Sequence, residues 1–189
     1  LALRTILGPH VEQKGSYVCD KYLRFDFSHF EKVSPEQLRQ VENMVNSLIR
    51  EDYPLQEKLD ATMEEAKGMG AMALFGEKYG DKVRVVKFGD SVELCGGIHC
   101  HATGHIGLFK IMSESAVSAG IRRIEACTGP EAEAYVESIE DKLHQIKELL
   151  GGAQDIKLAL EKALNENAAM KKEMEVVAKE RACALKNSL

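Results

Sequence analysis

The sequence lacks several features that would assign it to a common class of protein. No apolar run approaches the ~20 residues that a helix needs to cross a bilayer. The N-terminal stretch, residues 1–8, is too short and too weakly apolar for a signal peptide. Hydrophobic residues make up 44% and charged residues 29%, which excludes a disordered or membrane composition. A chain of 189 residues can then form one buried domain with an appendage, or two small domains.

The sequence also lacks an excess of basic residues. It contains 25 Lys and Arg against 30 Asp and Glu, so the formal net charge is −5. Nucleic-acid-binding proteins usually carry a basic stripe, but neither residues 1–130 nor residues 131–189 are basic. Bulk electrostatics therefore gives no support for RNA binding, and a contact with RNA would require a local patch.

Cysteine is scarce and odd in number. The five cysteines are irregularly spaced: Cys19, Cys95, Cys100, Cys127 and Cys183. Such a set does not indicate a disulfide framework. We therefore expect a reducing, cytoplasmic localisation.

Residues 1–130 carry alternating strand and helix signals. The run before Gly8 predicts the last turns of a helix, and without an initiating Met it suggests a piece of a longer protein. A capping box formed by Ser34 and Gln37 predicts a helix to about residue 50, and a second helix is expected over residues 61–67. Strands are predicted over residues 16–18, 22–27, 55–59, 83–88, 92–94, 106–112 and 121–127.

The connections between these strands are predicted from their turn residues. Asp20-Lys21 is expected to form a tight turn, Lys14-Gly15 another turn, and residues 116–120 a loop of small residues. Together these elements predict an α+β domain whose sheet is mostly antiparallel and packed against helices.

From residue 131 onward the pattern becomes purely helical. Apolar residues step by three and four, and the pattern resumes after Gly151-Gly152 with a heptad seam that has Asn167 at one core position. We expect residues 131–189 to form a helical hairpin or coiled coil that serves as a connector. Such a seam would also allow a homo-oligomer.

The segment from residue 95 to residue 105 concentrates metal-binding side chains. It holds two of the five cysteines and three of the six histidines: Cys95, His99, Cys100, His101 and His105. Thiolate and imidazole are the ligands that zinc prefers, and Gly96-Gly97 would let the loop turn so that Cys95 and His99 face one point. His101 and His105 remain alternative ligands. The other interpretation is a glycine-rich loop with surface histidines and a buried thiol.

Several motifs, in order and at matching spacing, resemble the editing domain of alanyl-tRNA synthetases. The motifs are Cys95-Gly-Gly-Ile-His99, Thr103-Gly-His-Ile-Gly107, Lys110-Ile-Met-Ser-Glu-Ser115, Gly120-Ile-Arg-Arg-Ile-Glu-Ala126, His10-Val-Glu-Gln13, Leu23-Arg-Phe-Asp-Phe-Ser-His29 and Gly70-Ala-Met-Ala-Leu-Phe-Gly-Glu-Lys-Tyr79. Several long motifs in register are more specific than any single one. The resemblance covers residues 1 to about 130, and the helical stretch suits the region that leads to this family's C-terminal domain.

The resemblance implies a zinc-dependent hydrolase that cleaves serine or glycine from mischarged tRNA(Ala). The family binds its metal through a His-x-x-x-His pair and a Cys-x-x-x-His pair, and Cys95 and His99 match the second pair. The first pair would lie upstream of Leu1, so we expect this chain by itself to bind zinc weakly and to be inactive. Ile98 stands where the family usually has Thr, and Cys100 and His101 also depart from the motif.

The resemblance also implies roles for other residues. Gln13 lies where the family places a glutamine in the editing pocket, and we assign it to substrate recognition. His29 is a weaker candidate for substrate contact. Arg122 and Arg123 are candidates for contact with tRNA phosphates, although one of them is expected to face the core side of its strand and pair with a carboxylate.

Other functions fit parts of the same sequence. One is the related editing domain of a threonyl-tRNA synthetase or of a free-standing editing protein, but the long heptad tail argues against it. Another is a catalytically silent tRNA-binding or dimerisation module. Nothing in the sequence resembles an ATP-binding domain, so ATP binding and aminoacyl-adenylate synthesis would belong only to a full-length ligase.

Overall fold

The computed structural model describes residues 1–71 and 80–187, and the side chains of residues 184–187 are left out. The chain divides into two compact units, Leu1–Tyr135 and Val136–Leu189. Most of the motif that begins at Gly70 lies outside the described residues.

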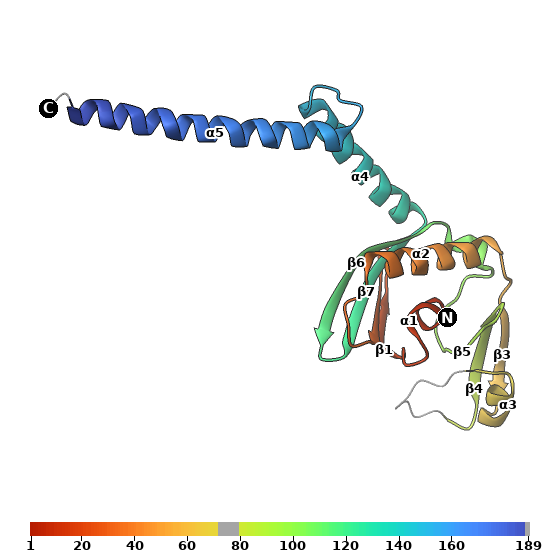
Figure 1. Ribbon diagram of the computed structural model, residues 1–189. Helices are drawn as coiled ribbons and strands as arrows, with labels where there is room; N and C mark the ends of the chain where they lie inside the picture. Colours follow the sequence, from red (N-terminus) through yellow and green to blue (C-terminus); the bar gives the residue numbers. More distant parts are fainter. Residues whose placement is uncertain (72–79, 188–189) are drawn as a thin grey trace. The chain divides into compact units, whose positions relative to one another are not determined.

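The elements follow the chain in an order that mixes strands and helices (Figure 1). They are α1 (Ala2–Leu7), β1 (Gln13–Val18), β2 (Leu23–Ser28), α2 (Pro35–Arg50), β3 (Gln56–Ala61), α3 (Met63–Gly68), β4 (Val83–Phe88), β5 (Ser91–Leu94), the 3-10 helix η1 (Thr103–Ile106), β6 (Phe109–Ser118), β7 (Ile121–Thr128), α4 (Pro130–Leu149) and α5 (Ile156–Asn187).

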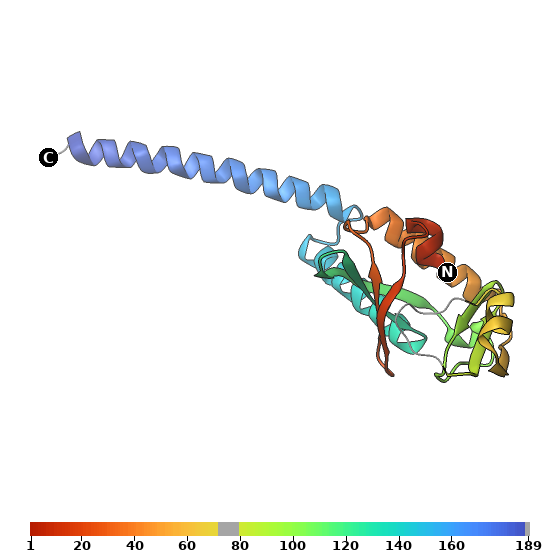
Figure 2. The ribbon, with the colours of Figure 1, turned by 90° about the horizontal axis from the view of Figure 1, so that it is seen from below.

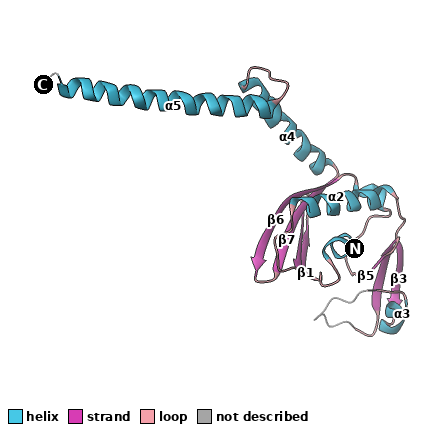
Figure 3. Ribbon diagram, viewed as in Figure 1, coloured by secondary structure: helices cyan, strands magenta, loops and turns pink. Residues whose placement is uncertain are grey.

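The described strands of the first unit form two separate sheets (Figure 3). The larger sheet has the order β1-β2-β7-β6 and the smaller one the order β3-β4-β5. All neighbouring strands in both sheets are antiparallel. The predicted α+β class with an antiparallel sheet and packed helices is therefore confirmed.

The larger sheet buries one face under α1 and α2. Along β2 the side chains alternate, so that Phe25 and Phe27 face this core while Asp26 lies on the opposite face. The core cluster consists of Val11, Phe27, Val33, Ile49, Phe109, Ile124 and Ala126. Helix α2 begins at the predicted capping box, in which the Gln37 amide donates to Ser34 Oγ at 3.2 Å and the Ser34 amide donates to Gln37 Oε1 at 2.9 Å.

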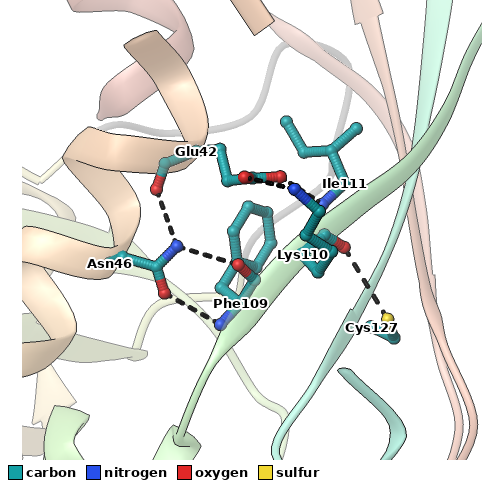
Figure 4. Close-up of polar contacts among 6 residues, drawn as sticks. All are labelled: Glu42, Asn46, Phe109, Lys110, Ile111 and Cys127. Carbon is teal, nitrogen blue, oxygen red and sulfur yellow. Dashed lines mark hydrogen bonds and ion pairs between the residues drawn. The ribbon is translucent and has the colours of Figure 1, made fainter. Parts of the chain in front are cut away.

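Side chains of α2 also satisfy the outer edge of β6 (Figure 4). Asn46 Nδ2 donates to the Phe109 carbonyl at 2.8 Å, and the Phe109 amide donates to Asn46 Oδ1 at 2.9 Å. One turn earlier, Glu42 accepts from the Ile111 amide at 2.9 Å and from Lys110 Nζ at 2.8 Å. Because an unpaired edge strand exposes alternate backbone groups, these side chains replace a fifth strand at this end of the sheet.

The smaller sheet has its own core of Ala61, Ala66, Val83, Val85 and Leu94. Helix α3 packs on it and begins two residues later than predicted, because Ala61 ends β3 and Thr62 is the cap. Glu65 completes this second capping box and pairs with Lys58 at 2.7 Å, and these contacts lower the pKa of its carboxyl to about 2.

Three predicted features of the sheets differ in the structure. Lys14-Gly15 is not a turn but an irregularity in the β1–β2 ladder. The turn at Asp20-Lys21 forms as predicted, closed by the Cys19 amide, which donates to the Tyr22 carbonyl at 3.0 Å, and Figure 2 shows the red and orange hairpin of β1 and β2. The strand expected from residue 106 starts at Phe109 because η1 precedes it. Residues 116–118 continue β6, because Gly120 has a φ of 71° that allows a short turn into β7.

The second unit is helical. Helices α4 and α5 are separated at Gly151-Gly152, where both glycines have positive φ. Many apolar residues of the predicted seam are exposed in this chain, among them Leu143, Leu160 and Met174. None of the described helices is long and apolar enough to span a membrane.

Candidate functional site

The Cys95–His99 loop follows directly from the end of β5. Arg84 on the neighbouring strand β4 holds this loop, because its Nη1 donates to the Gly97 carbonyl at 2.5 Å. The Arg84 guanidinium is itself fixed by Glu57, with contacts of 2.9 and 2.6 Å to one carboxylate oxygen. The Cys95 amide donates to the Arg84 carbonyl at 3.2 Å, so the backbone and side chain of one residue position the loop.

The surroundings of His99 favour its neutral imidazole form. Its ring lies beside Phe88, with a centroid distance of 6.2 Å, and its Nε2 is buried without a hydrogen-bond partner among the described residues. Burial lowers the pKa of His99 below its ordinary value of 6.5, and the charge of Arg84 lowers this pKa further. The neutral form keeps a lone pair available, which is the form that binds a metal or accepts a proton.

The residues after His99 are held more firmly than the loop itself. Thr103 Oγ1 accepts from the Tyr53 amide at 2.9 Å and donates to the last turn of α2. The Leu55 amide donates to the His101 carbonyl at 2.8 Å, and the Gly104 amide donates to Asp52. These contacts anchor the loop's C-terminal side to the end of α2.

The other histidines and cysteine of this segment do not form a larger cluster with Cys95 and His99. His101 and His105 are exposed, and Cys100 is half-buried. Among residues 1–71 and 80–187, no three His, Cys, Asp or Glu side chains are arranged to hold one metal ion. Ile98, between the two predicted ligands, is fully exposed.

Gln13 lies at the start of the edge strand β1, opposite Phe27 in β2. Its side chain is half-buried, and its Nε2 donates to Ser16 Oγ at 3.2 Å. The ladder irregularity at Lys14 and Gly15 places Gln13 on the same face of the sheet as Phe27. The predicted substrate-recognition residue thus lies on the helix-covered face, at one edge.

His29 follows the end of β2 and contacts a second histidine. The Nδ1 atom of His29 lies 2.8 Å from Nε2 of His10, and the two ring planes are within 21° of each other, with centroids 5.1 Å apart. The His29 ring also lies near that of Phe27, with centroids 6.4 Å apart. The His29 amide donates to the Gly120 carbonyl at 2.9 Å, which ties this position to the β6–β7 turn.

Both predicted tRNA-binding arginines pair with carboxylates. Arg122 lies on the core side and pairs with Glu114, which is 2% exposed, at 2.5 Å. Arg123 lies on the opposite face and donates to both oxygens of Asp26, at 2.6 and 2.8 Å. We expected one such pair, and the structure has two. The Arg123 contact is the first cause that lowers the pKa of Asp26.

The sequence did not single out Arg84 or His10. Arg84 was only one residue of a predicted strand, and its role depends on the pairing of β4 with both β3 and β5. His10 stands in a quoted motif, but its contact with His29 depends on the hairpin that brings residues 10 and 29 together. The register of that hairpin is the signal that could have indicated the pair.

A family comparison matches part of the first unit. Residues 83–125 match the family described as "Threonyl and Alanyl tRNA synthetase second additional domain". The match includes the Cys95–His99 loop and both arginines of β7. This is the class of domain that the motifs indicated.

Whole-chain comparisons identify the relatives more closely. The chain is 53% identical over 188 residues to "Alanine--tRNA ligase" of Bacteroides thetaiotaomicron and 55% identical to that of Bacteroides fragilis. It is 54% identical over 189 residues to the protein of the same name from Flavobacterium psychrophilum. These matches cover 100% of this chain but only 22%, 22% and 21% of the relatives. The resemblance to a segment of alanyl-tRNA synthetases is therefore confirmed, and the chain spans about a fifth of the length of these relatives.

Proposed function

We propose that this chain is the editing module of an alanine–tRNA ligase, and that within the longer protein it hydrolyses the ester that links serine or glycine to tRNA(Ala). The observation that carries the proposal is the similarity of the whole chain to these ligases. The loop with a thiol and a neutral imidazole gives it a chemical basis. The activity of the complete ligase, including ATP-dependent aminoacylation, would depend on parts of the protein outside this chain.

Editing is needed because an alanine-binding pocket discriminates poorly against similar small amino acids. A pocket that accepts alanine cannot strongly reject glycine, which is smaller, and serine adds only one hydroxyl. A second site must therefore remove these amino acids after attachment. An amide such as that of Gln13 could bind the serine hydroxyl or hold a water molecule, since it offers both a donor and an acceptor.

Zinc is the cofactor that best suits Cys95 and His99. The buried Nε2 of His99 has no partner among the described residues, and a thiolate with an imidazole matches zinc chemistry. When bound, a zinc ion would hold the amino group of the substrate, orient the ester or activate a water. Two ligands bind zinc weakly, so the site would need further ligands.

The position of α1 is consistent with further ligands that come from a segment before Leu1. A cleft of about 230 Å³ is lined by Leu1 and Arg4 of the α1 region together with residues 90–93, which lead to Cys95. Burial raises the pKa of Glu93 in this cleft. A segment that precedes Leu1 in a longer protein would therefore join the chain at this cleft, next to residues of β5.

Transfer RNA is the proposed partner, and Arg123 is the better of the two predicted phosphate contacts. Arg122 is 13% exposed at its side chain and Arg123 is 27% exposed. Each pairs with its carboxylate through Nε and Nη2, so a phosphate could contact Nη1 without breaking the pair. A phosphate contact would give binding that weakens with salt.

The proposal is tested by deacylation of Ser-tRNA(Ala) with the protein that carries this chain. We expect Cys95→Ala and His99→Ala each to reduce the rate about 100-fold or more, in line with loss of a metal ligand. Cys183→Ala, which removes an exposed cysteine on α5, is the matched control and should leave the rate unchanged. Undiminished hydrolysis by both loop variants would overturn the proposal. Binding of tRNA without hydrolysis by the unsubstituted protein would favour the silent module instead.

The exposed seam of α4 and α5 suggests a further property of this module. We propose that these helices support a homo-oligomer. We also propose that the protein works in the cytoplasm. The homo-oligomer is supported by the apolar seam residues that no described residue covers, including Leu143 and Leu160. Light scattering after chromatography tests this, and a mass that stays monomeric at high concentration would contradict it.

A further inference from the structure

His10 and His29 form a pair that the proposed roles leave unused. The Nε2 atom of His10 lies 2.8 Å from Nδ1 of His29, which is a hydrogen-bonding distance. Two neutral imidazoles can share only one proton along this line, because one nitrogen must donate and the other must accept. Whether the outer nitrogen of each ring carries a proton then depends on which ring is the donor.

Local structure fixes His10 in this position. The His10 ring packs against Gly8, where a Cβ would come within 3.0 Å of Nδ1, and Gly8 has a φ of 118°. Ser28 Oγ donates to the His10 carbonyl at 2.8 Å and accepts from the Glu12 amide at 2.9 Å. The glycine exit from α1 and the serine at the end of β2 thus place the His10 ring on His29.

The pair lies beside the predicted substrate-recognition residue. Gln13 is opposite Phe27, and the ring of His29 contacts that same phenylalanine. The Nε2 atom of His29 makes no hydrogen bond to a described residue, so it is available to a bound molecule. The hairpin register therefore gathers an amide and one unoccupied imidazole nitrogen at one end of the β1–β2 ladder.

We propose that His10 is a positioning residue for His29. By occupying Nδ1, it fixes the orientation of the His29 ring, couples the tautomer of that ring to its own, and leaves Nε2 for the aminoacyl ester or its attacking water. This inference rests on the proposed function and adds a residue to the same site. A ring held in one orientation acts as a better acid, base or hydrogen-bond partner than one that rotates freely, as in other histidines oriented by a second group.

Two substitutions separate hydrogen bonding from packing. His10→Phe keeps an aromatic ring at this position but cannot hydrogen-bond to Nδ1, whereas His10→Gln can still donate or accept there. His144→Phe changes an exposed histidine on α4 and serves as the matched control. Circular dichroism and thermal melting establish that each variant is folded.

The first readout does not depend on activity. Long-range proton–nitrogen NMR spectra report the protonation of each ring nitrogen. In the unsubstituted chain and in His144→Phe we expect one proton between His10 Nε2 and His29 Nδ1, so that the two rings have complementary tautomers. In His10→Phe we expect the nitrogen shifts of His29 to move, with recovery toward the unsubstituted values in His10→Gln. An unchanged His29 spectrum in His10→Phe overturns the proposal.

The second readout is deacylation of Ser-tRNA(Ala) by the protein that carries this chain. We expect His10→Phe to lower kcat about 10-fold with KM changed less than about 2-fold, and His10→Gln to restore most of the rate. Equal kcat in His10→Phe and the unsubstituted protein overturns the proposal. An unsubstituted protein that does not hydrolyse the ester overturns the proposed function instead, and the NMR result then decides the pairing alone.

Discussion

The two sheets of the first unit use their polar groups differently. In the four-stranded sheet the charged groups bind one another, as Asp26 does with Arg123 and Glu114 with Arg122. In the three-stranded sheet, Arg84 and Glu57 also pair, but they do so to hold a loop that ends in an imidazole nitrogen without a partner. The larger sheet also has buried polar atoms without a hydrogen-bond partner, Arg24 Nε and Glu114 Oε2, but both side chains form ion pairs, whereas His99 forms none among the described residues.

This difference indicates where ligand chemistry can occur. A buried polar group without a partner costs free energy, so folded proteins rarely keep one without a function. The arginines of β7 were predicted to contact tRNA, yet their first role in the structure is to hold strands together. The arginines of β7 are used in ion pairs, whereas the loop after β5 carries a thiol and an imidazole nitrogen without a described partner.

The largest expected effect tests the difference between the two cores. Phe27 is fully buried in the larger core, and Phe27→Ala should lower the free energy of unfolding by about 4 kcal/mol. Val85 is 1% exposed in the smaller core, and Val85→Ala should cost about 2 kcal/mol. Val18→Ala, at a position that is 75% exposed, is the control and should change little. Urea denaturation measures all three, and a larger loss for Val85→Ala would reverse our view of which core stabilises the unit.

The next effect concerns the ion pair on the outer face of the larger sheet. Asp26→Asn removes the charge that binds Arg123 through two hydrogen bonds, and we expect a loss of about 2 kcal/mol at pH 7. The folded state lowers the pKa of Asp26 below 3.8, so its contribution is present above that pH. It is lost as the pH falls through the lowered folded value.

The pH dependence therefore distinguishes this pair from a general loss of stability. The unfolding free energy of the unsubstituted chain should fall more steeply below pH 3.8 than that of Asp26→Asn. Asp20→Asn, at an exposed turn residue, is the control. Parallel pH profiles for the Asp26 variant and the unsubstituted chain would show that the pair does not stabilise the sheet.

The sequence predicted the elements that depend on local signals. Ser34 and Gln37 form the expected capping box, and the strand over residues 83–88 has the predicted bounds. Both depend on neighbouring residues: a cap with its partner three positions on, and a β-branched run. By contrast, the end of β6 depends on the turn at Gly120 and on the ladder with β7. The prediction of a loop over residues 116–120 was therefore wrong for residues 116–118.

The candidate site was less accessible to sequence reasoning. The Cys95–His99 loop was found because its ligand types are adjacent in sequence. The pairing of Arg123 with Asp26 joins residues 97 positions apart, and that of His10 with His29 joins residues 19 apart. Contacts of this kind follow from strand order and register, which no single segment specifies.

A smaller effect tests the side chains that complete the edge of β6. Asn46→Ala leaves the amide and carbonyl of Phe109 without partners, and we expect a loss of about 1.5 kcal/mol. Asn43→Ala on the exposed face of the same helix should cost less than about 0.5 kcal/mol. Amide hydrogen exchange should show the Phe109 amide losing protection only in the first variant. Unchanged protection at Phe109 would show that Asn46 does not close the edge.

The smallest expected change in stability is at the site itself. His99→Ala removes a ring whose Nε2 has no described partner, so in metal-free buffer the free energy of unfolding should change by less than about 1 kcal/mol. The same variant should lose the response to zinc, measured as the increase in melting temperature of the protein that carries this chain, because a ligand stabilises only the state that binds it. Arg84→Met is the informative comparison, since it removes the group that holds the Gly97 carbonyl but neither predicted ligand. If His99→Ala destabilised the metal-free protein as much as Asp26→Asn does, the imidazole would belong to the structural groups, and the contrast between the two sheets would be wrong.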